Sequence, residues 1–327
     1  MKKTFLFIAI LFFAYLNTTA QNVSAYHYGS YQPGLMNIRD LATVPSPGMI
    51  LIDYNYWLKS DGYYDQNGDR LSLDRVDSQI DGYINVPVVY YASDWKIFGA
   101  RYSVALAPLY MSAGAMINIH FNDEVDDITV TPNVSGFGDL IFSPLTLGWS
   151  FNDHMDFSFL YTAYAPTGRY KTGADDNIGK GYWTHQFQTP FYYYLMEKAT
   201  ALFVMPTFET NGHVKGSDVR PGNRFSIDYG ISQYVTKWLE LEVLNGHTWQ
   251  IGDDKGDDVW WNGTRFEGRD HTNTVSFGVG AWPWEGRLNV RAKYIMDYGV
   301  RQRLKTNFLS FSVIFIPNIL TGTKNKK

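Results

Sequence analysis

The sequence predicts an all-β protein, a transmembrane antiparallel β-barrel of about 12 strands with short periplasmic turns and longer external loops. Apolar and polar residues alternate with a period of two in many segments of the 327-residue chain, as they do in strands that separate two solvents. Aromatic residues make up 17% of the chain. Beyond the N-terminal apolar run, no segment approaches the stretch of about 20 apolar residues that a transmembrane helix needs.

The N-terminus has the pattern of a secretory signal peptide. Lys2 and Lys3 precede an apolar run from Thr4 to Leu16, and Ala20 provides a small residue before a cleavage point. The apolar run is too short to span a bilayer, and the chain contains no cysteine for a lipid anchor or a disulfide framework. We therefore predict a signal peptide at 1–20, a lead-in or small plug at 21–47, the outer-membrane barrel at 48–317 and a periplasmic tail at 318–327.

The hairpin between Ser135 and Tyr170 shows the repeating unit. A tight turn at residues 151–154 precedes its second strand, which has an aromatic-rich face and a polar face. The first face consists of Met155, Phe157, Phe159 and Tyr161, and the second of Asp156, Ser158 and Thr162. Similar strands are predicted over 49–58, 78–92, 97–111, 183–195, 199–210, 225–232, 239–243, 275–281, 288–296 and 308–315. The predicted connections alternate strictly between short and long, which is typical of outer-membrane barrels.

Charged side chains recur on the polar faces of these strands. A soluble two-layer sandwich or a propeller is the alternative fold, but its interior would not tolerate mid-strand charges such as Glu240 and Arg291. A barrel with a water-filled lumen tolerates such inward-facing charges. The predicted lumen-lining residues are Asp53, Asp81, Arg101, Asp139, Asp156, Asp228, Glu240, Glu242, Arg291, Lys293 and Asp297. A narrow lumen with both signs of charge is either a tight substrate passage or a salt-bridged filling that holds the barrel rigid.

Other residue patterns favour no catalytic, cofactor or metal site. The 7 histidines lack nucleophile-elbow and metal-ligand spacings, so we predict that the protein is not an enzyme. The acidic segments 65–69 and 253–258 lack the glycine position and the closing glutamate of a calcium loop, and we interpret them as external loops near lipopolysaccharide. A net charge of -4 gives no electrostatic case for nucleic acid binding. Eight tryptophans near strand ends are predicted to form aromatic belts, namely Trp57, Trp95, Trp149, Trp183, Trp238, Trp249, Trp282 and Trp284.

Three motifs carry a resemblance to a known family. They are the segment 31–48, which contains YQPGLMNIRD and PSPG, then GFGDL at 136–140 followed by Ser143-Pro144, and APTGRY at 165–170. Together they resemble the outer-membrane barrel family named for the meta-pathway of phenol degradation. The likeness covers nearly the whole mature chain. It implies passive transport of small hydrophobic or aromatic compounds, and it supplies no catalytic residue.

The leading functional hypothesis is a monomeric channel in the outer membrane of a Gram-negative bacterium, in contact with its lipids and lipopolysaccharide. Its substrate would be a small, hydrophobic or aromatic molecule that crosses by passive diffusion. One alternative is a structural or adhesive barrel with a closed lumen, which acts through its external loops. Another is an outer-membrane lipid hydrolase. The sequence leaves open the substrate, the gating and the role of residues 21–47.

Overall fold

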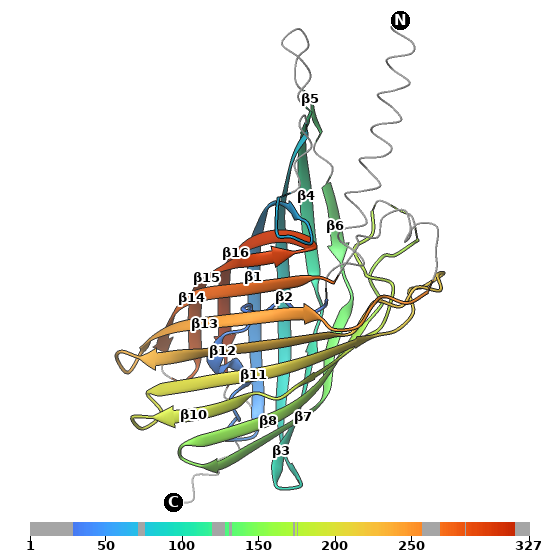
Figure 1. Ribbon diagram of the computed structural model, residues 1–327. Helices are drawn as coiled ribbons and strands as arrows, with labels where there is room; N and C mark the ends of the chain where they lie inside the picture. Colours follow the sequence, from blue (N-terminus) through green and yellow to red (C-terminus); the bar gives the residue numbers. More distant parts are fainter. Residues whose placement is uncertain are drawn as a thin grey trace, which may run out of the picture.

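A computed structural model describes residues 29–70, 76–119, 128–130, 133–172, 174, 176–256, 269–284 and 286–317. The predicted signal peptide and periplasmic tail lie outside these residues. Sixteen β segments form one antiparallel sheet, which closes because β1 pairs with both β2 and β16 (Figure 1). The segments are β1 (Gly48–Tyr64), β2 (Val76–Ile97), β3 (Ala100–Ala107), β4 (Tyr110–Ile119), β5 (Ile128–Val130), β6 (Asn133–Phe137), β7 (Leu140–Asn152), β8 (Met155–Ala165), β9 (Thr184–Gln188), β10 (Phe191–Leu195), β11 (Thr200–Asn211), β12 (Arg224–Tyr234), β13 (Leu239–Gln250), β14 (His271–Trp284), β15 (Leu288–Arg301) and β16 (Arg303–Phe315).

Several of these segments are pieces of one interrupted strand. β3 and β4 both pair with β2 and are separated at Pro108, while β9 and β10 both lie between β8 and β11 and are separated at Pro190. Proline lacks the N–H that a ladder requires, which accounts for both interruptions. β5, β6 and β7 likewise follow one another along a single strand path. Counted in this way, the sheet is a closed barrel of 12 strands, which confirms the predicted fold class.

The connections distinguish the two ends of the barrel. The strand ends joined by the short connections 98–99, 153–154, 196–199, 235–238 and 285–287 lie at one end of the barrel, and the strand ends joined by the longer connections 65–75, 120–127, 166–183, 212–223 and 251–270 lie at the other. Short turns mark the periplasmic end of outer-membrane barrels. The predicted strict alternation is wrong at one place, because Gln302 alone joins β15 to β16 at the long-loop end with a φ of 53°. Among the described residues, no helix is long and apolar enough to cross a membrane.

Aromatic side chains gather on the outer face near both ends. Toward the long loops, Trp249 stacks with His247 and His271 at centroid distances of 5.4 and 5.6 Å. Toward the short turns, Trp95 and Trp238 are 67% and 55% exposed. Amphipathic rings favour the level of the lipid headgroups, so these positions agree with two aromatic belts.

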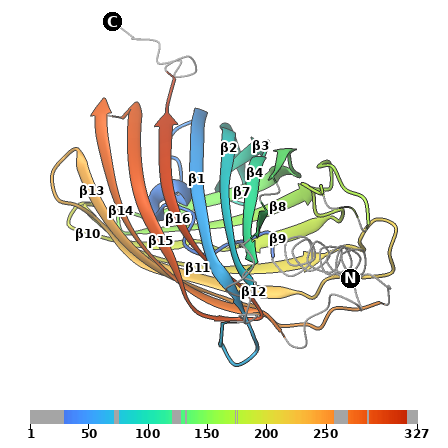
Figure 2. The same ribbon diagram turned by 90° about the horizontal axis from the view of Figure 1, so that it is seen from above.

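The chain before β1 lies inside the barrel. Lys180 of the long loop 166–183 donates a hydrogen bond to the carbonyl of Gly29, and Arg101 near the short turns donates one to the carbonyl of Pro45. The segment therefore runs through the lumen from the long-loop end to the short-turn end. Between these points lies the 3-10 helix η1 (Ile38–Leu41), and Figure 2 shows this blue segment surrounded by the strands. We call residues 29–47 the plug.

Candidate functional site: a plugged lumen

Carboxylates of the barrel wall bind the backbone of the plug. Glu209 on β11 accepts hydrogen bonds from the N–H groups of Ser30 and Tyr31, at 2.9 to 3.1 Å. Asp228 on β12 accepts one from the N–H of Gly34 at 3.0 Å and another from the Tyr31 hydroxyl. An irregular buried backbone needs partners for its polar groups, and here the wall supplies them. Charge-assisted hydrogen bonds of this kind are stronger than neutral ones, so the wall holds the plug firmly.

Below these contacts, charged groups from plug and wall form a balanced cluster. Arg291 on β15 lies between Glu240 and Asp40, and its Nη1 is 3.5 Å from the Asp40 carboxylate. Lys293 is 2.9 Å from Glu242, whose other oxygen accepts the N–H of the plug residue Ile38. These five charged side chains are at most 5% exposed, and each faces an opposite charge. This central ion network comprises Arg39, Asp40, Glu240, Glu242, Arg291 and Lys293.

A second cluster lies toward the long loops. Arg224 and Arg303 both contact Asp270, at 2.9 and 3.4 Å. Arg303 also donates to the side chain of Gln32, which in turn donates to Asp297 at 3.0 Å. The upper part of the plug is therefore fixed to β15 and β16 as well. Within the described ranges, no three His, Asp or Glu side chains converge as a metal site would require.

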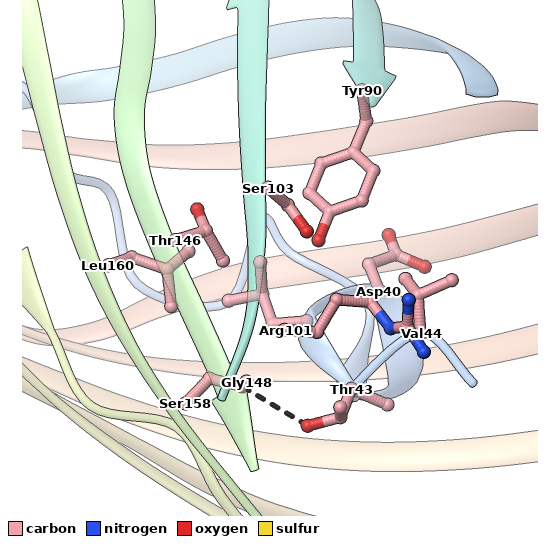
Figure 3. Close-up of a pocket in the computed structure, with 12 residues that line it drawn as sticks. Asp40, Thr43, Val44, Tyr90, Arg101, Ser103, Thr146, Gly148, Ser158 and Leu160 are labelled. Carbon is pink, nitrogen blue, oxygen red and sulfur yellow. Dashed lines mark hydrogen bonds between the residues drawn. The ribbon is translucent and has the colours of Figure 1, made fainter. Parts of the chain in front are cut away.

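The opposite wall of the lumen is different. Its inward-facing residues on β3, β7 and β8 include Ser103, Thr146, Gly148 and Ser158, and they leave a small cavity beside the plug residues 40–44 (Figure 3). The cavity measures about 20 Å³, whereas a dry cavity that holds benzene measures about 150 Å³. As it stands, this space is too small for an aromatic ring.

Comparison with known proteins places the chain in a family. Residues 60–313 match the family model described as "Putative MetA-pathway of phenol degradation". The chain belongs to this family. The COG4313 outer membrane channel from Pseudomonas putida F1 is similar in structure, with a TM-score of 0.64 and 16% sequence identity over 88% of this chain and 100% of that chain. A Pseudomonas aeruginosa FadL homologue matches over 91% of this chain and 97% of that chain, with a TM-score of 0.39 and 11% identity. No curated protein matches significantly.

The structural likeness establishes the fold of an outer-membrane barrel for this member of the phenol-degradation family. The range matched by the family model contains Glu209, Asp228 and Glu242, the three carboxylates that bind the backbone of the plug. It begins within β1 and does not include the plug itself. The family model therefore covers the wall side of these contacts but not the plug side.

Most of the charged residues predicted to line the lumen lie on its inner side. Arg101 binds the plug near the short turns. Asp139 instead accepts N–H bonds from Gly168 and Lys180 and supports a long loop, while Asp156 binds Ser150 and Tyr194 on the wall. Besides Arg101, the predicted residues that contact the plug through side chains, directly or within the ion network, are Asp228, Glu240, Glu242, Arg291, Lys293 and Asp297.

The prediction for Asp53 and Asp81 is corrected. On β1 it is Tyr54 that points inward, where its hydroxyl donates to the plug residue Asp40. Asp53 is therefore on the outer face, bonded to Asn85 at 2.8 Å. Asp81 is exposed and is paired in register with Lys59 on the same outer face. Alternation in the sequence separates two faces, but it does not say which of them faces the lumen.

Several residues of the site could not be found by this pattern. Glu209 shares its strand face with Phe203 and Met205, which are buried against the plug, so that face reads as apolar in the sequence. The plug residues Arg39 and Asp40 lie outside any strand, in a turn-rich segment without periodicity. Their only signal is that two adjacent charges stand in an otherwise uncharged segment of the lead-in.

The side chain of Lys180, in the long loop 166–183, should make the free energy of unfolding depend on pH. Burial lowers its pKa to about 8, although Nζ donates to Gly29 and Ser30. The unfolded chain, with a lysine pKa of about 10.4, binds more protons above pH 8, so stability rises with pH across this window. Because the side chain is only half-buried, we expect a rise of about 1 kcal/mol between about pH 8 and about pH 9.5.

This rise is measured as the free energy of unfolding in urea, followed by tryptophan fluorescence in lipid vesicles. The matched variant is Lys180→Met, which should show a flatter dependence on pH than the parent. Equal slopes for the two proteins would show that Lys180 does not change its protonation within this window.

Proposed function

We propose that this family member is a monomeric outer-membrane channel of a Gram-negative bacterium, through which small hydrophobic or aromatic molecules diffuse passively. The observation that carries the proposal is the division of the lumen. Charged groups of β11, β12, β13, β15 and β16 bind the plug, whereas the wall beyond the plug is lined mainly by apolar and small uncharged side chains. Its two charged side chains, Arg101 and Asp156, are engaged in hydrogen bonds. A passage for ions or sugars would need free polar groups along its wall, whereas a passage for apolar molecules needs them covered.

Dye entry into intact cells tests this function. Lipopolysaccharide slows the entry of the neutral aromatic dye 1-N-phenylnaphthylamine, whose fluorescence rises when it reaches membrane interiors. Cells that express the protein should take up the dye several-fold faster than cells with an empty vector. Nitrocefin, a charged molecule that a periplasmic β-lactamase hydrolyses, should enter both at the same rate. This second rate also controls for general damage to the outer membrane.

Two results contradict the proposal. Dye entry equal to that of the vector cells would agree with a barrel that acts only through its external loops. Faster entry of nitrocefin without faster entry of the dye would indicate a hydrophilic pore.

A further inference from the structure

One strand of the lumen wall carries a continuous line of apolar side chains. Ile84, Val86, Val88 and Tyr90 all point inward from β2, toward the short turns in that order. They are only half-buried, although they face the lumen. On the charged side of the plug, inward-facing residues such as Lys293 are almost completely covered. Accessible space inside the barrel therefore lies along β2, and we call these four residues the apolar strip.

The apolar strip ends at the small cavity beside the plug. Tyr90 lines this cavity together with Ser103 and Gly148 of the wall, and the plug closes it from the other side (Figure 3). The side chain of Thr43 lies directly against Gly148, since a Cβ placed at Gly148 would be 3.0 Å from it. The contact between Thr43 and Gly148 therefore blocks the lumen at the short-turn end of the apolar strip.

The plug is held unevenly along its length. Residues 29–42 have the carboxylate contacts and the central ion network, and Leu41 and Ala42 pack against a buried aromatic cluster. The segment from Thr43 to Pro47, which we call the strap, has much weaker contacts. The Thr43 hydroxyl lies 3.4 and 3.5 Å from its two partners, and the shortest hydrogen bond to the strap is that from the Arg101 guanidinium to the carbonyl of Pro45, at 2.9 Å.

We propose that small apolar molecules move along the apolar strip and leave toward the periplasm when the strap swings away from Gly148, while residues 29–42 stay in place. This inference rests on the proposed function and names its route and its gate. The strip offers no charged group to such a molecule until Arg101, whose guanidinium donates to the carbonyls of Ser93 and Pro45. Opening requires the loss of few hydrogen bonds, whereas expulsion of the whole plug would leave buried charges on the wall unpaired.

Engineered disulfides can lock each part of the plug separately, since the chain has no cysteine of its own. A Cβ at Gly148 would lie 3.4 Å from the Cβ of Thr43, and a Cβ at Gly34 would lie 3.7 Å from that of Thr274. Both separations are close to the value of about 3.8 Å that a disulfide prefers. The first pair, Thr43→Cys with Gly148→Cys, ties the strap to the wall. The second, Gly34→Cys with Thr274→Cys, ties the anchored part and is the matched control.

We expect oxidised Thr43→Cys/Gly148→Cys to reduce dye entry to the level of vector cells, and dithiothreitol to restore it. The oxidised Gly34→Cys/Thr274→Cys variant should admit the dye at the parent rate. Folding of each variant is checked by its heat-modifiable migration on gels, because Gly34 has a φ of +82° that strains a side chain. A third variant, Arg101→Met, releases the strap without a crosslink and should admit the dye several-fold faster than the parent.

The outcomes separate the strap from the proposed function. If both locks stop the dye, the whole plug must move, and the strap is not the gate. If the Thr43–Gly148 lock leaves entry unchanged in a permeable parent, the route lies elsewhere, although the channel function stands. If the uncrosslinked parent admits no more dye than vector cells, the proposed function fails and this route fails with it.

Discussion

Replacing Arg291 with methionine should lower the free energy of unfolding by about 3–5 kcal/mol, because it removes one partner of a buried ion network. The guanidinium contacts Glu240, Asp40 and Glu242 at once, and the side chain of Arg291 is only 5% exposed. Methionine replaces the aliphatic part of the arginine side chain without its charge. The carboxylates would then face one another with fewer cations, and this loss of compensation makes the substitution costly. Urea unfolding in lipid vesicles measures the effect.

Arg269→Met is the matched control for this substitution. Arg269 forms an ion pair with Asp253 at 2.9 Å, but the two side chains are 51% and 73% exposed. Exposed pairs contribute at most about 1 kcal/mol, so this variant should unfold nearly like the parent. In addition, Asp40→Asn combined with Arg291→Met should be more stable than Arg291→Met alone, since it removes one of the uncompensated carboxylates. A cost for Arg291→Met no larger than that of Arg269→Met would mean that water, and not the arginine, solvates these carboxylates.

Replacing plug residues 30–40 with glycine and serine residues of equal length should raise ion conductance by about tenfold, to that of a water-filled twelve-stranded barrel. The replacement removes the side chains of Tyr31, Ile38, Arg39 and Asp40 from the lumen, together with the turn geometry that presents backbone N–H groups to the wall. The freed carboxylates would then attract cations. Single-channel recording in planar bilayers measures both the conductance and the cation preference.

The control for this variant keeps the plug and alters an external segment. Replacing residues 212–218 with glycine and serine changes a long loop of comparable size without touching the lumen contacts of the plug. Its conductance should equal that of the parent. A low conductance after replacement of the plug would show that the side chains of the wall close the lumen by themselves, and it would remove the plug from the mechanism.

Local sequence pattern predicted much of this fold for a physical reason. The period of two is a property of single strands, and hydrocarbon forces any strand-built membrane protein to close into a barrel. The first fact reveals the individual strands and most of the turns between them, so the strands can be counted, and the second implies that they close into a barrel. The inward charges of β12, β13 and β15 were also predictable, because Asp228, Glu240, Glu242, Arg291 and Lys293 interrupt strands whose other face is strongly apolar.

The interrupted strands show where local pattern gives less information. Pro108 and Pro190 were present in the predicted strands, but the sequence does not reveal that each piece keeps its place in the ladder on both sides of the break. The one-residue connection at Gln302 was also missed. Pairing between neighbouring strands, rather than a turn motif, determines that β15 and β16 are long enough to meet there.

The sequence by itself therefore determined a twelve-stranded barrel, its polarity and one charged face of its lumen. Only the tertiary structure decided what fills that lumen. The plug has no period of its own, and its position depends on wall residues about 180 to 270 positions away in the sequence, as with Tyr31 and Glu209 or Gln32 and Arg303. Leu35 of the plug packs with Tyr54 and Tyr56 on the inner face of β1, so that Asp53 lies on the outer face. The facing of a strand depends on its neighbours in space, and a linear pattern cannot contain that information.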